Sequence, residues 1–296
     1  MTILAGADAG GTRTTAAIMV DGVEASRVVG AAGAVRPGRS LGSGSAIGAT
    51  VRKALSQAGK LRADVLVVGA AGVGREAERV ALRNALRLED VAERIAVVTD
   101  MEVAREAAFG ECPGIVLLAG TGSVAVGRLP DGNLRRQGGY GWQMGDEGSG
   151  YALGRAALRA VGRMQDGRGT QTALGRILEA QTRSGSYDEL VRWSTTAGPG
   201  EVASLARGVL EAAATGDGAA LEILASEAKA LARLAIVLAE EWPGSDPVDV
   251  AQGGSLLLPG PYRDLVDIQL AAAPRLRPHP GVPDGVAGAL AIAART

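Results

Sequence analysis

The sequence carries one pattern twice, and this repeat limits the folds that the chain can adopt. Residues 9–22 and residues 119–132 each begin with Ala-Gly after an apolar run, pass through a turn rich in Gly, Thr and Ser, and end in Asp-Gly at the same distance. Asp-Gly between two β-type runs is a strong hairpin signal. A strand–turn–strand unit that occurs twice in the same element order indicates a duplicated fold.

Strands and helices alternate after each copy of the repeat. After the first copy we expect a loop, helix, strand, helix, strand and short helix in turn, over 31–43, 45–58, 64–70, 75–88, 95–98 and 101–109. After the second copy we expect a mostly helical stretch, a strand and two helices, over 147–241, 248–251, 259–272 and 284–295. Such alternation predicts a largely parallel sheet covered by helices on both faces in each half.

The length of 296 residues suits two domains. We place the boundary where charge, Pro and Gly cluster, which gives an N-terminal domain over 1–113 and a C-terminal domain with a helical insertion over 114–296. The last helix, 284–295, is open to a second assignment, in which it packs back onto the N-terminal domain.

Charge and cysteine content exclude several classes of protein. With 31 Lys and Arg against 32 Asp and Glu, the chain has no general attraction for nucleic acid or an anionic membrane. A phosphate must therefore be bound by a specific local site. No run of 18 apolar residues suggests a membrane span, and Cys112 is the only cysteine. We therefore expect a cytoplasmic protein without nucleic-acid or membrane partners. The sequence leaves open whether the chain forms a homodimer.

Two glycine-rich turns, one in each copy of the repeat, are candidates for binding phosphate. Glycine lets the backbone approach an anion and turn its N–H groups toward it. Asp8, at the end of the first strand, is placed to hold a hydrated Mg²⁺. Plain hairpin turns are the alternative for either turn alone, but the pairing favours phosphate. The candidate ATP-binding residues here are Gly10, Gly11, Thr12, Arg13, Thr121 and Gly122.

A third glycine site follows the expected strand over 248–251. Gly253, Gly254 and Ser255 stand at the carboxyl end of that strand, where ligands bind in open α/β sheets, and would let an adenine lie against the backbone. A plain strand-to-helix turn is the alternative. The Walker phosphate loop, with its glycines followed by Lys and Ser or Thr, does not occur in the chain.

These three sites resemble the two phosphate motifs and the adenosine motif of the actin/heat-shock-ATPase/hexokinase superfamily. Residues 139–151, Gly-Tyr-Gly-Trp-Gln-Met-Gly-Asp-Glu-Gly-Ser-Gly-Tyr, are very similar to a signature of the N-acetylglucosamine kinase and BadF/BadG/BcrA/BcrD-type ATPase family. The resemblance covers essentially the whole chain. It implies an α/β fold of duplicated ribonuclease-H-like (actin-like) domains, with mixed central sheets flanked by helices and two lobes around a nucleotide cleft, and with ATP and Mg²⁺ as cofactors.

That family holds two chemistries, and the cysteine count distinguishes them. One is phosphorylation of hexosamines, and the other is ATP-driven electron transfer through a cysteine-bound iron–sulfur cluster at a subunit interface. Because Cys112 would supply only two thiols to a dimer, we expect an ATP-dependent kinase of N-acetylglucosamine or glucosamine, acting at the 6-hydroxyl. N-acetylmuramic acid or dual-specificity kinases, an ATPase without a small acceptor, and a sugar-binding regulator are the alternatives.

Asp100 is the candidate catalytic base. It follows the expected strand over 95–98, and the resemblance implies a catalytic Asp at this place. The sequence also fits a helix N-terminus in which Thr99 and Glu102 form a capping box. Both readings can hold, since a helix N-terminus stabilises an ionised carboxylate.

The resemblance implies that Asp146 binds sugar hydroxyls together with the loop before it. The alternative for Asp146 is an N-cap of a helix that starts near Glu147. Trp142 either stacks on a sugar face or packs in the core. Family kinases place an Asn that contacts the sugar in the loop that corresponds to residues 34–39. Here the candidates for that contact are Arg36 and Arg39, which would suit an anionic substrate such as N-acetylmuramic acid; the alternative is that they face solvent. The candidate substrate-binding residues are Asp146, Gly139, Tyr140, Gly141, Arg36 and Ser123.

Overall fold

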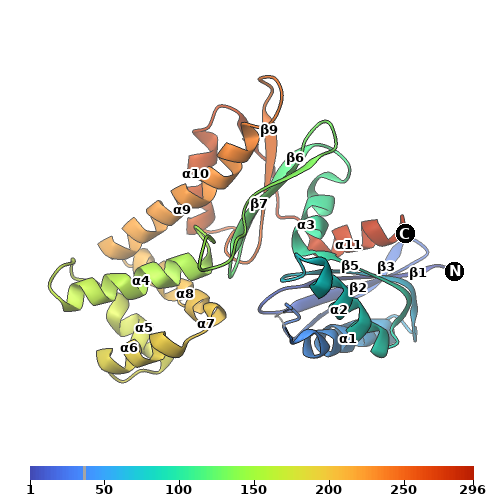
Figure 1. Ribbon diagram of the computed structural model, residues 1–296, viewed down its shortest axis with the longest axis horizontal. Helices are drawn as coiled ribbons and strands as arrows, with labels where there is room; N and C mark the ends of the chain where they lie inside the picture. Colours follow the sequence, from blue (N-terminus) through green and yellow to red (C-terminus); the bar gives the residue numbers. More distant parts are fainter. Residues whose placement is uncertain (36–37) are drawn as a thin grey trace. The chain divides into compact units, whose positions relative to one another are not determined.

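The computed structural model describes residues 1–35 and 38–296 and divides into two compact units (Figure 1). The first unit combines residues 1–112 with residues 283–296, and the second is the continuous stretch 113–282. The last helix therefore groups with the N-terminal residues. Arg36, a predicted substrate contact, lies outside the described residues.

The first unit is built on a five-stranded mixed sheet in the order β3-β2-β1-β4-β5. Its first three strands form antiparallel pairs, whereas β1, β4 and β5 run parallel. The carboxyl ends of these three parallel strands therefore lie at one edge of the sheet. The strands are β1 (Ile3–Ala9), β2 (Thr14–Val20), β3 (Val23–Gly30), β4 (Ala63–Ala70) and β5 (Ala92–Thr99).

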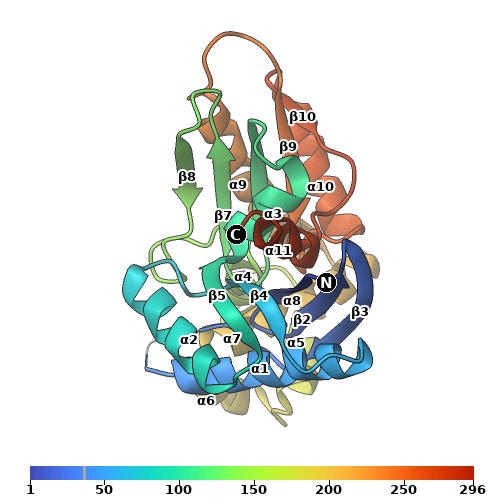
Figure 2. The same ribbon diagram turned by 90° about the vertical axis from the view of Figure 1, so that its right-hand side faces the viewer.

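Helices cover both faces of this sheet, because the central strands β1 and β4 carry mainly buried residues on both faces. Figure 2 shows α1 (Ser40–Gln57) and α2 (Glu76–Leu88) on one side, and α3 (Asp100–Phe109) with α11 (Gly285–Ala293) on the other. Side chains that alternate along β1 pack into two separate cores, one beneath α1 and α2 and the other beneath α3 and α11. The first unit is thus a three-layer α/β structure.

The contact between α3 and α11 requires a residue without a side chain. A Cβ atom added at Gly288 would lie 2.0 Å from the carbonyl oxygen of Val103, which is closer than any real contact. Glycine therefore lets the backbone of α11 touch the backbone of α3. Beyond this contact, an ion pair of 2.7 Å joins Arg295 to the buried Glu106 of α3.

The second unit repeats the sheet topology of the first. Its order is β10-β9-β6-β7-β8, which, counted from β8, gives the same succession of antiparallel and parallel pairs as the first sheet. This correspondence confirms the duplicated fold that the sequence repeat predicted. The strands are β6 (Gly114–Ala119), β7 (Ser123–Arg128), β8 (Leu134–Gly138), β9 (Val248–Gly253) and β10 (Leu276–Pro278).

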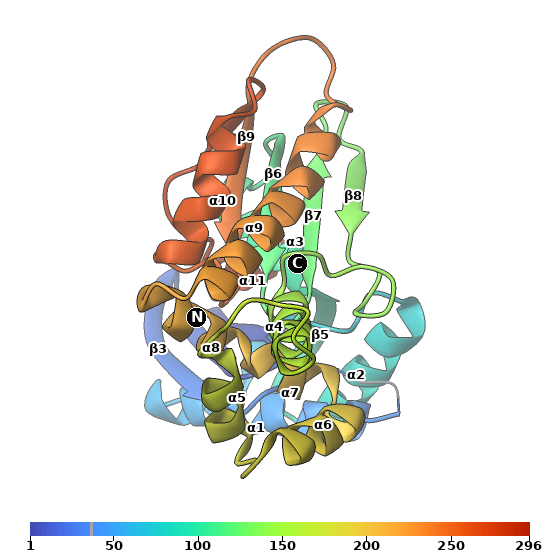
Figure 3. The same ribbon diagram turned by 90° about the vertical axis from the view of Figure 1, so that its left-hand side faces the viewer.

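Helices make up most of the second unit. In Figure 3, α9 (Gly218–Ala239) and α10 (Pro261–Ala271) lie side by side over the sheet. The remaining helices form the predicted helical insertion, and their apolar faces join the same core as the sheet. They are α4 (Gly150–Gln165), α5 (Leu174–Thr182), α6 (Tyr187–Thr196), α7 (Pro199–Ser204) and α8 (Ala206–Ala214). Over the described residues, no helix combines the length and apolar character needed to cross a bilayer.

The two Asp-Gly pairs form different turns, although their sequences match. Asp21 and Gly22 both have positive φ, 47° and 84°, and connect β2 to β3 as a two-residue hairpin. Asp131 and Gly132 lie in a longer loop, in which the backbone N–H of Leu129 donates to Asn133. The repeat therefore holds for topology but not for every turn.

Candidate functional site

Asp8 lies at the edge of the first sheet, at the carboxyl end of β1. It precedes the turn between β1 and β2, in which the N–H of Gly10 donates to the carbonyl of Arg13 at 2.9 Å. The remaining residues of this turn, Gly11, Thr12 and Arg13, are exposed. Burial and the negative charges of Asp100 and Asp284 raise the pKa of the Asp8 carboxyl to about 6, against an opposing effect of Arg13.

Asp100 lies at the same edge, at the first position of α3. The predicted capping box is present: Thr99 Oγ1 accepts the N–H of Glu102 at 3.1 Å, and Glu102 accepts the N–H of Thr99 at 2.7 Å. The cap thus belongs to Thr99 and Glu102, while the Asp100 carboxylate accepts the neighbouring N–H of Met101 at 3.0 Å. Burial raises the pKa of Asp100, partly offset by backbone N–H groups.

Sequence reasoning missed Asp284 and Gly285, which complete this group in the first unit. Asp284 is the N-cap of α11, where it accepts the N–H of Val286 and pairs with Arg27 at 2.9 Å. A Cβ at Gly285 would lie 2.6 Å from the Asp8 carboxylate, so the first turn of α11 packs directly on Asp8. Asp before an apolar helix is a recognisable cap signal, but its distance from Asp8 in the sequence hides the contact.

Asp146 faces the second glycine turn inside the second unit. Its Oδ1 accepts the N–H of Ser123 at 3.2 Å, and a Cβ at Gly122 would lie 2.8 Å from the same oxygen. The alternative role as N-cap is wrong, because α4 begins at Gly150 and its cap is Ser149. Asp146 is buried with a φ of 63°, and burial raises the pKa of its carboxyl.

The second turn also contacts the third predicted glycine site. Gly254, with a φ of 91°, lies so close to the carbonyl of Ala119 that a Cβ there would be 2.3 Å from its oxygen. Thr121 is exposed beside these glycines. The second unit therefore brings together Thr121, Gly122, Ser123, Asp146, Gly253, Gly254 and Ser255, which lie far apart in the sequence.

The other predicted substrate-binding residues differ in how far their side chains are exposed to solvent. The hydroxyl of Ser123 is buried and donates to the carbonyl of Glu147 at 2.6 Å. Tyr140 is 58% exposed, with Arg136 over its ring, and it stands between two glycines of positive φ, Gly139 and Gly141. Trp142 is 41% exposed and lies against the ring of Tyr151, so it is not a core residue.

The residues present fit a magnesium ion held mainly by ligands outside the protein. No group of three or more His, Cys, Asp or Glu side chains converges on a metal position within 1–35 and 38–296. Mg²⁺ commonly uses one or two carboxylates, with water and phosphate oxygens for the rest of its octahedron. A partly buried carboxylate beside a glycine turn, as Asp8 is, suits that mode of binding.

The two repeated sheets and these carboxylates define the class as a duplicated, actin-like α/β protein. The chain belongs to the BadF/BadG/BcrA/BcrD ATPase family, whose pattern it matches over residues 5–293. This confirms the family expected from residues 139–151. A ROK family glucokinase from Streptomyces griseus, solved with glucose and AMPPNP, shares the fold with a TM-score of 0.64 at 18% identity, over 99% of both chains.

Two further proteins are similar in sequence, and the second of them is also similar in fold. An N-acetylmuramic acid/N-acetylglucosamine kinase from Clostridium acetobutylicum is 34% identical over 169 residues, which is 56% of this chain and 55% of that relative. A solved protein from Chromobacterium violaceum, termed a candidate N-acetylglucosamine kinase, is 28% identical with a TM-score of 0.80 over 99% of both chains. The chain spans about half the length of the curated relatives that it matches.

Proposed function

We propose that the protein is an ATP-dependent kinase that transfers the γ-phosphate to a hydroxyl of an amino sugar, N-acetylglucosamine or glucosamine, at the 6-position. Family membership and the kinases among similar proteins support this proposal. The main structural support is the environment of Asp100, a half-buried carboxylate of raised pKa beside Asp8. Asp100 is not needed as the cap of α3, because Thr99 and Glu102 form that cap.

In this proposal Asp100 is the general base. It accepts the proton of the sugar hydroxyl while the sugar oxygen bonds to the γ-phosphorus and the bond to ADP breaks. The raised pKa makes Asp100 a stronger base than an exposed Asp, as long as it is ionised at the working pH. Asp146 holds sugar hydroxyls together with the loop over 139–141.

ATP binds through backbone N–H groups and small side chains. Gly10, Gly11, Thr12 and Arg13 contact phosphates, as do Thr121 and Gly122, while the turn over 253–255 lies against the adenine. When bound at Asp8, Mg²⁺ would neutralise charge on the transferring phosphoryl group. Transfer then depends mainly on positioning and charge neutralisation, as is general for phosphoryl transfer.

N-acetylmuramic acid is the second candidate acceptor. The Clostridium relative carries this sugar in its name, and Arg39 is an exposed cation in the loop that leads into α1. An electron-transfer ATPase is disfavoured because Cys112 is the only cysteine of the chain. We also propose that the protein acts in the cytoplasm, where ATP is supplied.

A coupled assay of ADP release over a sugar panel tests this function. We expect ATP turnover that depends on the sugar and is highest with N-acetylglucosamine or glucosamine, with N-acetylmuramic acid and glucose as comparison substrates. Product analysis should place the phosphate on the 6-oxygen. ATP turnover of the same rate with and without every sugar would reject the kinase and favour the ATPase.

A further inference from the structure

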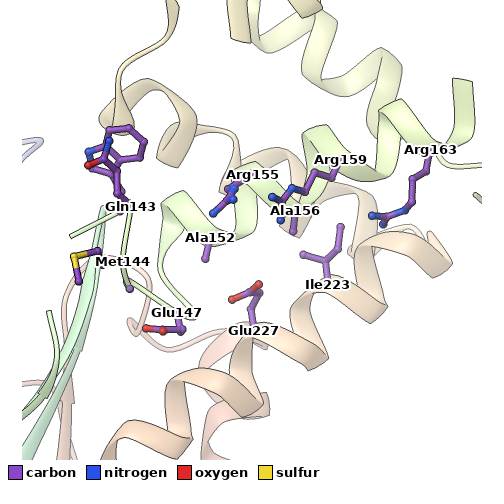
Figure 4. Close-up of a pocket in the computed structure, with 12 residues that line it drawn as sticks. Gln143, Met144, Glu147, Ala152, Arg155, Ala156, Arg159, Arg163, Ile223 and Glu227 are labelled. Atoms are coloured by element: carbon purple, nitrogen blue, oxygen red, sulfur yellow. The ribbon is translucent and has the colours of Figure 1, made fainter. Parts of the chain in front are cut away.

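The second unit contains a pocket that the proposed reaction does not use. Its volume is about 420 Å³, within the range typical of small-molecule sites. Figure 4 shows that one wall is the side of α4 and the facing wall is α9, with the loop over 142–147 at one end. All of its lining residues belong to the second unit.

Three arginines form one wall of this pocket. Arg155, Arg159 and Arg163 are four residues apart, so they lie on one face of α4 along about 12 Å of the helix. Their side chains extend along the wall toward the start of α4 (Figure 4). Among the described residues, none of the three guanidinium groups has an ion pair or a side-chain hydrogen bond.

The other walls supply groups of a different kind. Trp142, at the loop end of the pocket, is 41% exposed and offers an aromatic face. Glu147 and Glu227 are the two carboxylates of the lining, against three arginines. Glu227 already accepts the N–H of Gly148 at 2.8 Å, so it is held in place. Guanidinium groups bind phosphate, carboxylates accept hydrogen bonds from hydroxyls, and an aromatic face packs against a sugar ring.

The pocket is separate from the carboxylate that we assign to the acceptor sugar. Asp146 is absent from its lining, although residues on both sides of it, Gly145 and Glu147, are present. The reason is the direction of the Asp146 side chain, which bonds to Ser123 and lies against Gly122 at the second turn. The loop thus presents Asp146 to the turn and its neighbours to the pocket.

We propose that this pocket is a second ligand site, which binds a phosphorylated amino sugar. The phosphate lies on the arginine wall, mainly at Arg159, while the sugar lies between Trp142 and the carboxylates. The choice of a phosphorylated amino sugar rests on the proposed function, since this is the class of its product. The unpaired arginine wall, however, is independent of any catalytic activity.

Calorimetric titration without ATP tests the site on the full-length protein. The probe is N-acetylglucosamine 6-phosphate, titrated in saturating N-acetylglucosamine so that the site of Asp146 is filled by the neutral sugar. We expect binding that Arg159→Gln weakens at least about tenfold, because a charge-assisted hydrogen bond to phosphate is lost. Arg192→Gln, an exposed arginine of α6 outside the pocket lining, is the matched control and should bind as the wild type does.

Several outcomes overturn the proposal. Equal affinity of Arg159→Gln and the wild type for the probe removes the arginine wall from the site. If N-acetylglucosamine competes with the probe, the pocket is part of the acceptor site. If N-acetylmuramic acid binds more strongly than the probe, phosphate is not the anion that the arginines recognise. Because no step requires turnover, an inactive kinase with an intact pocket would reject only the proposed function.

Discussion

At the scale of single residues, the proposed chemistry depends on carboxylates that the fold partly removes from water. Asp8, near the end of β1, and Asp100, directly after β5, lie at the same edge of the first sheet, and burial raises the pKa of each. Asp146 is a third buried carboxylate, in the other unit. Groups with perturbed pKa values gather at functional sites because catalysis needs them, even where they reduce stability.

Replacing Asp100 by Asn separates catalysis from stability. We expect Asp100→Asn to lower kcat by about 10²–10⁴ with little change in ATP affinity, because the base is lost while the shape is kept. Stability at pH 7 should stay equal or rise, because burial disfavours the ionised Asp100 that Asn replaces. Steady-state kinetics and thermal unfolding measure both effects. Wild-type turnover in the variant would reject Asp100 as the base.

Asp8 should make stability depend on pH in a narrow window. Its pKa is about 6 in the folded chain and ordinarily 3.8, so between these values the folded state binds more protons. Stability should therefore fall as pH rises from about 4 to about 6, by at most about 3 kcal/mol, and then level off. Urea unfolding at several pH values checks this, and Asp8→Asn should remove that part of the slope. An unchanged slope in Asp8→Asn would show that other groups cause it.

At the scale of elements, one helix contact positions the candidate base. α3 begins with Asp100, and α11 packs on it through Gly288, while the first turn of α11 packs on Asp8. The position of both carboxylates therefore depends on a helix that is remote in the sequence. The sequence predicted the helices themselves from their apolar pattern, but periodicity carries no information about which helix pairs with which.

A methyl group at position 288 should disturb this contact. We expect Gly288→Ala to lower the free energy of unfolding by about 1–3 kcal/mol, because the new Cβ overlaps the Val103 carbonyl and α11 must shift. A shift of α3 should also reduce kcat, by up to about 10²-fold.

The control for this prediction is the same substitution at an open helix position. Nothing lies within 4 Å of a Cβ added at Gly42 of α1, so Gly42→Ala should raise stability by up to about 1 kcal/mol. Urea unfolding and kinetics of both variants give the comparison. Equal stability of Gly288→Ala and the wild type would mean that α11 does not depend on this approach.

At the scale of the whole molecule, the two units differ in how the chain forms them. The second unit, 113–282, is continuous and contains its own core. The first unit needs residues 283–296, because α11 covers an apolar face of its sheet that includes Leu4, Val65 and Val67. The two units should therefore respond differently to division of the chain.

Expressing the two stretches separately tests this difference. We expect residues 113–282 alone to melt cooperatively, whereas residues 1–112 alone should aggregate or melt without a transition, because their apolar face stays uncovered. Circular dichroism during heating measures this, with the full-length chain as reference. A cooperative transition in residues 1–112 alone would contradict the dependence on α11.

Much of the architecture was predictable, whereas the details of the site were not. The repeat at residues 9–22 and 119–132 predicted the duplicated topology because hairpin turns are local. The short edge strand β10 was missed because three residues ending in Pro278 carry no strand signal. The contact of Gly285 with Asp8 was missed because it depends on tertiary packing alone.

The grouping of residues 283–296 with the first unit has a consequence for synthesis on the ribosome. Chains are made from the N-terminus, so all of residues 113–282 are translated before α11 exists. A nascent chain therefore holds an unfinished first unit while the second already has every residue that it needs. The half of the protein that is made first is completed last, and Asp8 gains its final neighbour, Gly285, only at that moment.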